Sequence, residues 1–461
     1  MTTIAEIKKQ IESSSSRAVI EAAIKLAKDN SNYHALLNLT EERALKRADE
    51  VDAGRITGKL AGVPFVVKDN FLAFGAPTTA ASKMLENFDA PLQATAVEKL
   101  ELEGAICIGK ANLDAFAHGG STENSAFGPT KNAFDLTRVS GGSSGGSAVI
   151  TALNVVPFAL GSDTGGSIRQ PASFNGVVGV KPTYGTVSRY GVVAMASSTD
   201  VIGLFATNVS DAELVMEIMA GKDVRDMTTL PDFFKPETQI KSHQKIGIIK
   251  DFMTDAVDSD VRDRVNEYAD KLRADGHIIE EVSLSMAEYA LAIYYIIVPA
   301  ELSSNLARYD GIRYGYRAEG IKTLAELYGQ TRDKGFVTEN KRRIMIGSYV
   351  LSSGFFDAYY LKAQKARTLL INEFNELFKA YDLLIGPVAP TTAFKIGENT
   401  ADPIKMYMCD IMTVQTSLVG LPAISVPAGV SKSGLPIGVQ LMGPMCSDAK
   451  LLCLARSMET K

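Results

Sequence analysis

The sequence predicts an α/β protein built on a largely parallel or mixed sheet. Short β-branched runs, such as residues 62–70 and 105–108, alternate with segments whose apolar residues recur at helical spacing, such as residues 95–103. Strands that alternate with helices are typical of α/β architectures. The composition agrees, because 46% of the 461 residues are hydrophobic and 22% are charged, enough to bury a sizeable core. Length alone allows one large domain or two to three ordinary ones.

The N-terminal region, residues 3–54, is expected to be helical. Apolar residues recur at helical spacing from Ile20 to Ala27 and again from Ala35 to Ala53. At residue 62 the pattern changes to a β-branched run, which predicts a strand leading into a polar loop. The later elements expected are, in chain order, a helix at 95–103, a strand at 105–108, a polar loop at 119–147, a strand, helix and strand at 246–249, 261–274 and 277–282, mostly helices at 286–343, and strands at 383–387, 423–427 and 435–441.

Residues 138–191 have the most unusual composition of the chain. They contain eleven glycines and many serines, and apolar runs such as residues 149–160 interrupt them. A flexible linker is the alternative interpretation of such enrichment. The apolar runs favour a buried segment, where glycine permits tight turns and close approach of the backbone to a ligand.

Charge and cysteine content argue against several classes of function. A net charge of −5 with no basic cluster argues against a chain that grips a nucleic-acid backbone alone, although a partner could hold such a ligand. The cysteines form no CxxC pair and share no spacing with histidines, so we expect no metal site and buried, reduced thiols. They are Cys107, Cys409, Cys446 and Cys453.

No targeting or membrane segment is expected from the sequence. The N-terminus carries acidic and basic residues and lacks the apolar core of a signal peptide. No run approaches 18 apolar residues. We therefore expect a cytoplasmic protein without a membrane span.

Two motif matches are rejected. Residues 104–110 fit the first seven positions of a phosphate-binding P-loop, but Ala111 replaces the required hydroxyl residue and the intervening residues are apolar, as in a buried strand. Residues 141–145 fit the G-x-S-x-G pattern of α/β-hydrolases, but only His243 and His277 follow, each in a charged setting. Neither a nucleotide site nor a histidine-dependent triad is expected in this chain.

A serine that attacks an amide without histidine needs another base, and Lys68 is the candidate. Lysine can act as a base when burial lowers its pKa from about 10.4 towards about 7–8. Lys68 closes the apolar run that precedes it. The alternative is an ordinary surface lysine at the end of a strand.

Ser167 is the candidate nucleophile. It directly follows residues 164–166, Thr-Gly-Gly, where successive backbone N–H groups could converge on an oxyanion. Ser143 lies in a second Gly/Ser turn and could pass a proton between Lys68 and Ser167. By themselves such turns are more often structural than catalytic.

Three long runs of sequence resemble the amidase signature family. They are residues 141–147, 161–172 and 176–185. In that family a lysine, a serine held by a cis peptide and a nucleophilic serine form the triad. The resemblance places these roles on Lys68, Ser143 and Ser167, and it places the oxyanion donors on the backbone of Thr164, Gly165, Gly166 and Ser167.

The same resemblance implies an α/β/α sandwich around one mixed, twisted sheet, formed as a single domain over residues 1–461. Residues 1–54 would be a helical region packed on that domain. Residues 62–205 would be the core that carries the triad. Residues 205–461 would supply the remaining sheet and helices, with the substrate-recognition residues.

A narrower resemblance, to the A subunits of glutamyl- or aspartyl-tRNA amidotransferases, extends over nearly the whole chain. It rests on residues 82–87, 120–130, 188–194, 303–311, 341–345 and 389–394. The resemblance implies that glutamine is the ammonia donor.

Glutamine would be recognised at both of its charged ends. The resemblance places the clamp on the α-carboxylate at Arg343 and the partner of the α-ammonium at Asp410, as charge-assisted hydrogen bonds require. Either Tyr294 or Tyr295 is expected to contact the substrate. The remaining substrate contacts implied are Gly120 and Ser121. The alternative for Arg343 and Asp410 is a structural ion pair.

The resemblance also implies a division of labour within a complex. B and C subunits would complete a heterotrimer, ATP and Mg²⁺ would act in a partner, and misacylated tRNA would bind mainly through the partner. This chain is expected to hold no cofactor and no metal. The alternative function is a stand-alone amidase of the same family that acts on another small amide.

Some positions depart from the usual pattern of the family. Ser140 replaces a common proline, Asn175 replaces a cysteine or small residue, and His118 replaces the usual methionine. We expect His118 to border the substrate pocket. The sequence ends soon after Cys453, so a short or missing last helix is expected.

Overall fold

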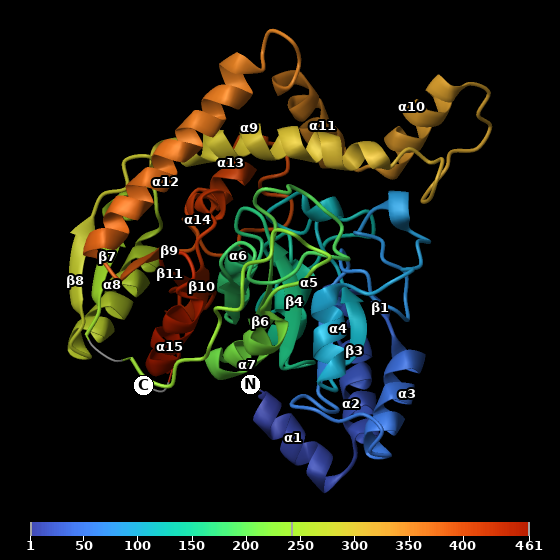
Figure 1. Ribbon diagram of the computed structural model, residues 1–461, viewed down its shortest axis with the longest axis horizontal. Helices are drawn as coiled ribbons and strands as arrows, with labels where there is room; N and C mark the ends of the chain where they lie inside the picture. Colours follow the sequence, from blue (N-terminus) through green and yellow to red (C-terminus); the bar gives the residue numbers. More distant parts are fainter. Residues whose placement is uncertain (1, 241–242, 460–461) are drawn as a thin grey trace.

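The computed structural model describes residues 2–240 and 243–459, and an 11-stranded mixed sheet runs through it (Figure 1). The strand order is β1-β3-β2-β4-β6-β5-β10-β11-β9-β7-β8. The strands are β1 (Leu36–Leu39), β2 (Pro64–Lys68), β3 (Ile106–Ala111), β4 (Phe158–Asp163), β5 (Val178–Lys181), β6 (Val201–Ala206), β7 (Lys245–Ile249), β8 (Ile278–Val282), β9 (Leu383–Pro387), β10 (Ala423–Val430) and β11 (Pro436–Met442). The α/β class expected from the sequence is confirmed.

Parallel and antiparallel pairs divide the sheet. Strand β2 pairs in parallel with β3 and β4, and β7 pairs in parallel with β8 and β9. The central strands β4, β6, β5, β10, β11 and β9 are joined by antiparallel pairs. In the register of β2 with β4, Val67 lies opposite Leu160. The carboxyl ends of these two parallel strands therefore meet at one edge, which is where ligands bind in α/β folds.

Helices cover both faces of the sheet. They are α1 (Ile4–Ser13), α2 (Ser16–Asp29), α3 (Glu41–Asp52), α4 (Thr95–Leu102), α5 (Gly145–Ala152), α6 (Arg169–Asn175), α7 (Val209–Met219), α8 (Ser259–Ala274), α9 (Ala287–Asn305), α10 (Leu324–Gly335), α11 (Thr338–Val350), α12 (Lys362–Ala380), α13 (Pro403–Tyr407), α14 (Val414–Val419) and α15 (Asp448–Glu459). Alternate residues of β2 face opposite layers: Phe65 and Val67 pack with α1, α4 and α7, whereas Val66 packs with α2, α3 and α5. This alternation is the pleat of a strand buried on both faces.

The first helices begin at side-chain caps that the sequence supplies. The Thr3 hydroxyl accepts a hydrogen bond from the Glu6 amide, and the Glu6 carboxylate accepts one from the Thr3 amide. Ser15 caps α2 by accepting a hydrogen bond from the Ala18 amide, without the reciprocal bond seen at α1. These bonds satisfy amides that a helix N-terminus leaves without partners.

Strand β1 corrects the expectation of a helix from Ala35 to Ala53. Residues 36–39 pair antiparallel with β3, with Leu36 opposite Ala111 and Leu39 opposite Gly109. All four residues of β1 are half-buried, so pairing with the sheet edge decides their conformation. Local periodicity is a weak signal over so few residues, and tertiary context overrides it. The helix begins only at Glu41, as α3.

The Gly/Ser-rich segment lies inside the molecule, as its apolar runs indicated. Residues 140–152 and 155–174 are almost all buried. The apolar stretch from Val149 to Leu160 divides into the end of α5 and the start of β4. The false P-loop is strand β3, and Lys110 donates hydrogen bonds to the Phe71 carbonyl and the Thr78 hydroxyl.

The last described helix, α15, contains Cys453, has 12 residues and packs its apolar side on the sheet. The expectation for the cysteines needs one correction. The four cysteines are free, but Cys446 is exposed whereas the other three are buried. No group of three potential metal ligands occurs among the residues that the structure describes.

One helical segment needs comment because of its apolar character. Ala287–Arg308, which contains α9, is long and apolar enough by length and composition to cross a membrane, and half of its most apolar window is buried in the molecule. The sequence expectation of no such run is therefore wrong by that measure. The core helices of proteins that do not cross membranes pass the same test. In Figure 1, α9, α11 and α12 lie together across the top of the molecule.

Candidate active site

Lys68 is the last residue of β2 and its side chain is fully buried. Its Nζ lies 2.8 Å from Ser143 Oγ and 3.0 Å from Ser162 Oγ, with the Ser162 carbonyl at 3.4 Å. Burial lowers the pKa of Lys68 to about 7, although Asp114 and two further carboxylates oppose the shift. A lysine in this state can take a proton near neutral pH.

Ser143 lies in the turn before α5, and the peptide bond between Gly142 and Ser143 is cis. Three contacts fix this turn. The Gly142 amide donates to Gln170 Oε1, the Thr122 hydroxyl donates to the Gly141 carbonyl, and the Asp114 amide donates to the Ser143 carbonyl. The hydroxyl of Ser143 is thereby held on the Lys68 amine.

Ser167 lies between β4 and α6 and is slightly exposed, whereas Lys68 and Ser143 are fully buried. The Ser144 amide donates to the Ser167 carbonyl at 3.2 Å. This bond joins the two Gly/Ser turns, so the structure brings Lys68, Ser143 and Ser167 into one cluster. Of these three residues, only Ser167 retains access to solvent, as a nucleophile requires.

The turn at residues 164–167 presents free backbone amides. Among the residues that the structure describes, the amides of Gly165, Gly166 and Ser167 make no hydrogen bond. The Thr164 hydroxyl donates to Asp200 at 2.7 Å, which holds the start of the turn. Unoccupied amides that converge in a short turn form a site for an oxyanion.

A buried ion pair stabilises the turn at residues 164–167. Arg169 and Asp163 are both fully buried and approach to 2.9 Å, and Asp163 also accepts from the Ile168 amide. Burial alone would raise the pKa of Asp163, but the Arg169 guanidinium holds it below its usual value. Arg169 also donates to the Thr413 carbonyl and the Thr416 hydroxyl. The turn is therefore tied to α14.

The glycines of the turn admit side chains from distant segments. A Cβ at Gly165 would lie 2.7 Å from the hydroxyl of Tyr294, and a Cβ at Gly166 would lie 2.3 Å from Thr413 Oγ1. Real Cβ atoms are not found so close to other atoms. Tyr294, on α9, and Thr413 thus form a wall against the oxyanion turn.

Arg343 lies on α11 beside two stacked tyrosines. Its guanidinium carbon lies 5.1 Å from the ring centroid of Tyr295 and 5.4 Å from that of Tyr407, and these rings stack at 3.9 Å. Arg343 Nε donates to Glu339 Oε1 at 2.8 Å, and the Tyr407 hydroxyl donates to the same oxygen at 2.9 Å. In the described part of the chain, the two terminal nitrogens of Arg343 have no hydrogen-bond partner. They are free for a bidentate carboxylate.

Asp410 ends the short 3₁₀ helix Met408–Asp410 and faces the same cluster. The Tyr295 hydroxyl donates to Asp410 Oδ2 at 3.4 Å, and a Cβ at Gly120 would lie 3.7 Å from Oδ1. Burial raises the pKa of Asp410 to about 7, and Arg343 opposes the shift. Asp410 and Arg343 are therefore near each other without forming an ion pair within 4.0 Å in the described residues.

The two substrate contacts predicted in the loop after β3, Gly120 and Ser121, have different neighbours. Gly120 faces Asp410, and its carbonyl accepts from Gln170 Nε2. Ser121 is buried next to the cis turn, because a Cβ at Gly142 would lie 2.6 Å from the Ser121 amide. Asp114 holds this segment through the Thr122 and Asn124 amides.

Both tyrosine candidates of the sequence prediction belong to the cluster. Tyr294 lies against the oxyanion turn, whereas Tyr295 contacts Asp410 and Arg343. Their rings meet edge to face at 5.1 Å. The two residues thus face different parts of the same site.

His118 is fully buried and ties α11 to the loop that carries Asp114. Asn340 donates through one nitrogen to the Ala115 carbonyl at 2.9 Å and to His118 Nδ1 at 2.6 Å. Because that nitrogen only donates, the proton of the neutral ring sits on Nε2. Burial, reinforced by the charge of Arg343, keeps the pKa of His118 well below its usual value.

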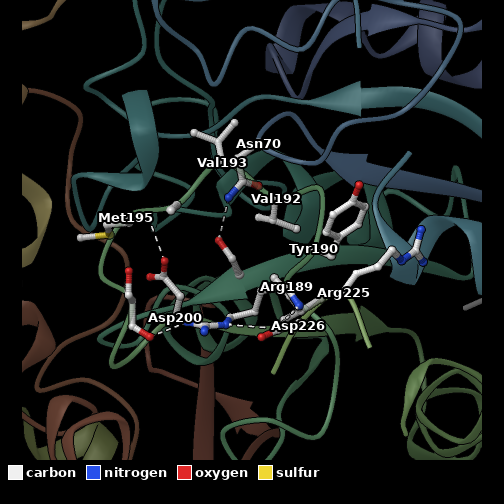
Figure 2. Close-up of a pocket in the computed structure, with 13 residues that line it drawn as sticks. Asn70, Arg189, Tyr190, Val192, Val193, Met195, Asp200, Arg225 and Asp226 are labelled. Carbon is white, nitrogen blue, oxygen red and sulfur yellow. Dashed lines mark hydrogen bonds and ion pairs between the residues drawn. The ribbon is translucent and has the colours of Figure 1, made fainter. Parts of the chain in front are cut away.

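A cavity of about 230 Å³, shown in Figure 2 with Asn70 and Asp200 labelled, is lined in part by Ser162, the second hydroxyl contact of Lys68. Asn70, Arg189 and Asp200 are among the other residues that line it. Asn70 Nδ2 donates to Ser162 Oγ at 3.1 Å. The same Ser162 oxygen therefore contacts both Lys68 and a wall of the cavity.

Six functional contacts were missed by the sequence reasoning. They involve Asn70, Asp114, Ser162, Gln170, Glu339 and Tyr407. Glu339 could have been found, because a glutamate four residues before an arginine on a helix is a favourable pair. Asp114 contacts Thr122, eight residues away, in an irregular loop without a sequence pattern, and the partners of the remaining four lie far away in the sequence.

The arrangement as a whole supports acyl transfer from an amide. The buried amine of Lys68 contacts Ser143, Ser143 lies beside the more accessible Ser167, and the turn that carries Ser167 has free amides. A cation and a carboxylate lie nearby on α11 and residues 408–410. Such a site can attack an amide, hold the oxyanion and bind a zwitterionic substrate.

Comparison with known proteins agrees with this chemistry. Residues 18–452 match the family model described as Amidase. The chain is 49% identical over 473 residues to the A subunit of glutamyl-tRNA(Gln) amidotransferase from Gloeobacter violaceus, an alignment that covers 100% of this chain and 96% of that protein. The protein of the same name from Lactiplantibacillus plantarum is 51% identical over 426 residues, covering 90% of this chain and 87% of that one.

Solved structures give the same result. The A subunit of glutamyl-tRNA(Gln) amidotransferase from Thermotoga maritima has a TM-score of 0.83 at 39% identity, covering 100% of this chain and 94% of that chain. A bacterial aryl acylamidase of the amidase signature enzymes has a TM-score of 0.85 at 26% identity, covering 100% and 96%.

Proposed function

Because the chain belongs to the amidase family, within the group of glutamyl-tRNA(Gln) amidotransferase A subunits, we propose that it hydrolyses glutamine to glutamate and ammonia with Ser167 as the nucleophile. The observation that carries the proposal is the contact of the buried Lys68 amine with Ser143, which lies next to Ser167. No histidine is needed in this arrangement.

The first half of the reaction forms an acyl-enzyme. Neutral Lys68 accepts the proton of the Ser143 hydroxyl, Ser143 accepts that of Ser167, and the Ser167 oxygen attacks the side-chain amide carbon. The amides of Thr164, Gly165, Gly166 and Ser167 hold the oxyanion. The C–N bond then breaks, the leaving nitrogen takes a proton through Ser143, and ammonia is released.

The second half of the reaction regenerates the serine. Water attacks the glutamyl ester and loses a proton to the same Ser143–Lys68 relay. The ester bond to Ser167 breaks, and the oxygen of Ser167 regains a proton. The products are glutamate and free enzyme, so atoms and charges balance over the cycle.

The recognition residues select an α-amino acid amide. The two free nitrogens of Arg343 bind the α-carboxylate, and Asp410 binds the α-ammonium. Tyr294, packed on the oxyanion turn, and Gly120, facing Asp410, shape the space between these charges and Ser167. Ser121 is buried next to Gly142 and supports the turn that carries Ser143.

The ammonia is used in a complex. The relatives are named as subunits of an amidotransferase, so partner subunits are implied. We propose B and C subunits in a heterotrimer, with ATP and Mg²⁺ acting in the partner that converts misacylated Glu-tRNA(Gln), Asp-tRNA(Asn) or both. The net charge of −5 supports a tRNA held mainly by the partner. A cytoplasmic complex without a membrane span fits this role.

The test is ammonia release from glutamine by the chain with and without its partners. We expect Ser167→Ala to lower kcat by at least about 1,000-fold, as removal of a serine nucleophile does, without loss of glutamine binding. Unchanged turnover in Ser167→Ala would rule out the mechanism. Full activity on other small amides but not on glutamine, with no effect of partners, would identify a stand-alone amidase instead.

A further inference from the structure

The hydroxyl of Ser162 is the second contact of the Lys68 amine, and the mechanism above gives it no role. It lies on β4 at 3.0 Å from Lys68 Nζ, nearly as close as Ser143 Oγ at 2.8 Å. The Ser162 carbonyl lies at 3.4 Å from the same nitrogen. Three oxygens thus compete for one amine.

The hydrogen-bonding capacity of a neutral amine decides between these contacts. Neutral lysine carries two N–H groups and one lone pair. A carbonyl only accepts, so the Ser162 carbonyl takes one N–H. If Lys68 is to accept a proton from Ser143, its lone pair must face Ser143, and the remaining N–H must point to Ser162 Oγ. If Ser162 instead donates to Lys68, the lone pair is occupied and the base is blocked.

Asn70 and the cavity favour the productive arrangement. Asn70 Nδ2 can only donate, and it donates to Ser162 Oγ at 3.1 Å, which occupies one lone pair of that oxygen. The second lone pair then accepts the N–H of Lys68. The proton of Ser162 is left to point towards the cavity that Ser162 and Asn70 both line (Figure 2). A space of this size, lined in part by polar groups, can hold water as the acceptor.

Asn70 offers a further anchor for such a water. Its Oδ1 is buried and has no hydrogen-bond partner among the described residues. One water between Ser162 Oγ and Asn70 Oδ1 would satisfy both groups, because an unpaired buried oxygen is costly.

We propose that Ser162 and Asn70 are positioning residues that turn the lone pair of Lys68 towards Ser143, with water in the cavity accepting the Ser162 proton. This inference rests on the proposed function only in taking Lys68 as the base. It does not depend on the identity of the amide substrate.

The charged groups around Lys68 bear on any test by pH. Asp114 from the loop after β3, Asp163 at the end of β4 and Asp200 before β6 all favour the charged amine, against the effect of burial. None of them hydrogen-bonds to Lys68 in the described residues. Changes at Ser162 and Asn70 leave these three carboxylates in place.

The acid limb is the part of the pH–activity profile in which the rate rises as Lys68 loses its proton. Two variants should shift this limb in opposite directions. Ser162→Ala removes an acceptor that stabilises the protonated amine more than the neutral one, so the limb should shift to lower pH by about one unit. The rate on the plateau above the limb should fall by at least about tenfold. Asn70→Asp places a carboxylate behind Ser162 and should shift the limb to higher pH. Ser162→Thr keeps the hydroxyl and should restore the wild-type limb.

The measurement is made twice on the intact complex, as ammonia release from glutamine and as the rate of inactivation of Ser167 by phenylmethylsulfonyl fluoride. The second readout needs no glutamine, so inactivation with the expected limbs but no glutamine hydrolysis would refute the proposed function alone. The matched control is Ser147→Ala, because Ser147 is a buried serine that donates to β4 at the Leu160 carbonyl without touching Lys68; its limb should not move.

Two results would overturn the proposal. One is a Ser162→Ala enzyme that loses rate at every pH with its limb unmoved, which is the signature of a merely structural residue. The other is a shift of the same sign in Ser162→Ala and Asn70→Asp. If Ser162→Ala does not fold, Ser162→Thr and Asn70→Asp decide the question, and an unshifted limb in Asn70→Asp counts against the proposal.

Discussion

The two halves of the site are built in different ways. The proposed catalytic half, residues 68, 143 and 162–167, lies at the ends of adjacent strands and in the turns between them. The recognition half, Tyr294, Tyr295, Glu339, Arg343, Tyr407 and Asp410, lies on α9, α11 and residues 403–410. The sheet fixes the first half, since β2 and β4 pair directly. Contacts among side chains fix the second half.

This difference separates their electrostatics as well. The Lys68 amine contacts two hydroxyls and one carbonyl, and burial brings its pKa to about 7. Arg343 instead carries a permanent partner in Glu339 at 2.8 Å. The catalytic half is therefore poised to change charge during the reaction, whereas Arg343 in the recognition half keeps its charge. We expect changes in the two halves to act on different kinetic parameters.

The largest effect on this comparison is expected from Lys68→Met. A buried methionine keeps the volume and removes the base, so kcat should fall by about 100- to 10,000-fold while the KM for glutamine changes little. Steady-state ammonia release measures both parameters. A comparable rise in KM would show that the catalytic half also binds the ground state.

Arg343→Ala should have the opposite signature. It removes two charge-assisted hydrogen bonds to the α-carboxylate, and each bond to a charged group contributes about 1.5–3 kcal/mol, so the KM should rise by at least about 100-fold with a smaller change in kcat. An amide that lacks the α-carboxylate serves as the control, because its turnover should not depend on Arg343. Equal losses with both substrates would show that Arg343 only supports the fold.

The pH dependence should separate the halves within the wild-type enzyme. Asp410 has a pKa raised to about 7 by burial, so lowering the pH neutralises it and weakens its hold on the α-ammonium; KM should rise about tenfold between about pH 8 and about pH 6. Protonation of Lys68 over the same range removes the base and lowers kcat. In Asp410→Asn the KM should be high at every pH while the kcat profile stays. A KM that still follows pH would assign the titration to another group.

The smallest effect is expected from Glu339→Gln. The Gln side chain at position 339 keeps an oxygen acceptor for Arg343 and Tyr407 but removes a negative charge that competes with the carboxylate of the substrate. The KM for glutamine should therefore fall about two- to fivefold. Glu339→Ala loses the acceptor too, and its KM should rise. Glutamine should raise the Tm of Glu339→Gln more than that of the wild type. A higher KM in Glu339→Gln would show that charge, rather than orientation, is what Glu339 supplies.

The sequence pointed to the principal residues of both halves, but not to the contacts that hold these residues in place. Lys68 at the end of an apolar run and Ser167 after two glycines are local patterns. The resemblance to the amidase signature family places both residues in one triad. Tyr407 bonds to Glu339 across 68 residues of sequence, and Asn70 bonds to Ser162 across 92. No local pattern encodes such contacts.

The fold shows the same limit at its edge. Strands such as β2 and β9 were predicted within a few residues from their short apolar runs, whereas the central strands β4, β5 and β6 were not predicted. Strand β1 was missed because Leu36–Leu39 is short and half-buried and lies between two helices. Its pairing with β3 supplies the decisive interaction, and that pairing is set only when the sheet assembles.

The contacts of the oxyanion turn with Tyr294 and Thr413 limit how the sequence of this enzyme can change. The missing Cβ atoms of Gly165 and Gly166 leave the space that Tyr294 and Thr413 fill, so each pair shares one fixed volume. A methyl group gained on the turn must be balanced by atoms lost from the opposite segment. We expect descendants with altered amide selectivity to carry paired replacements at 165 and 294, or at 166 and 413, because either change alone would push the oxyanion turn out of place.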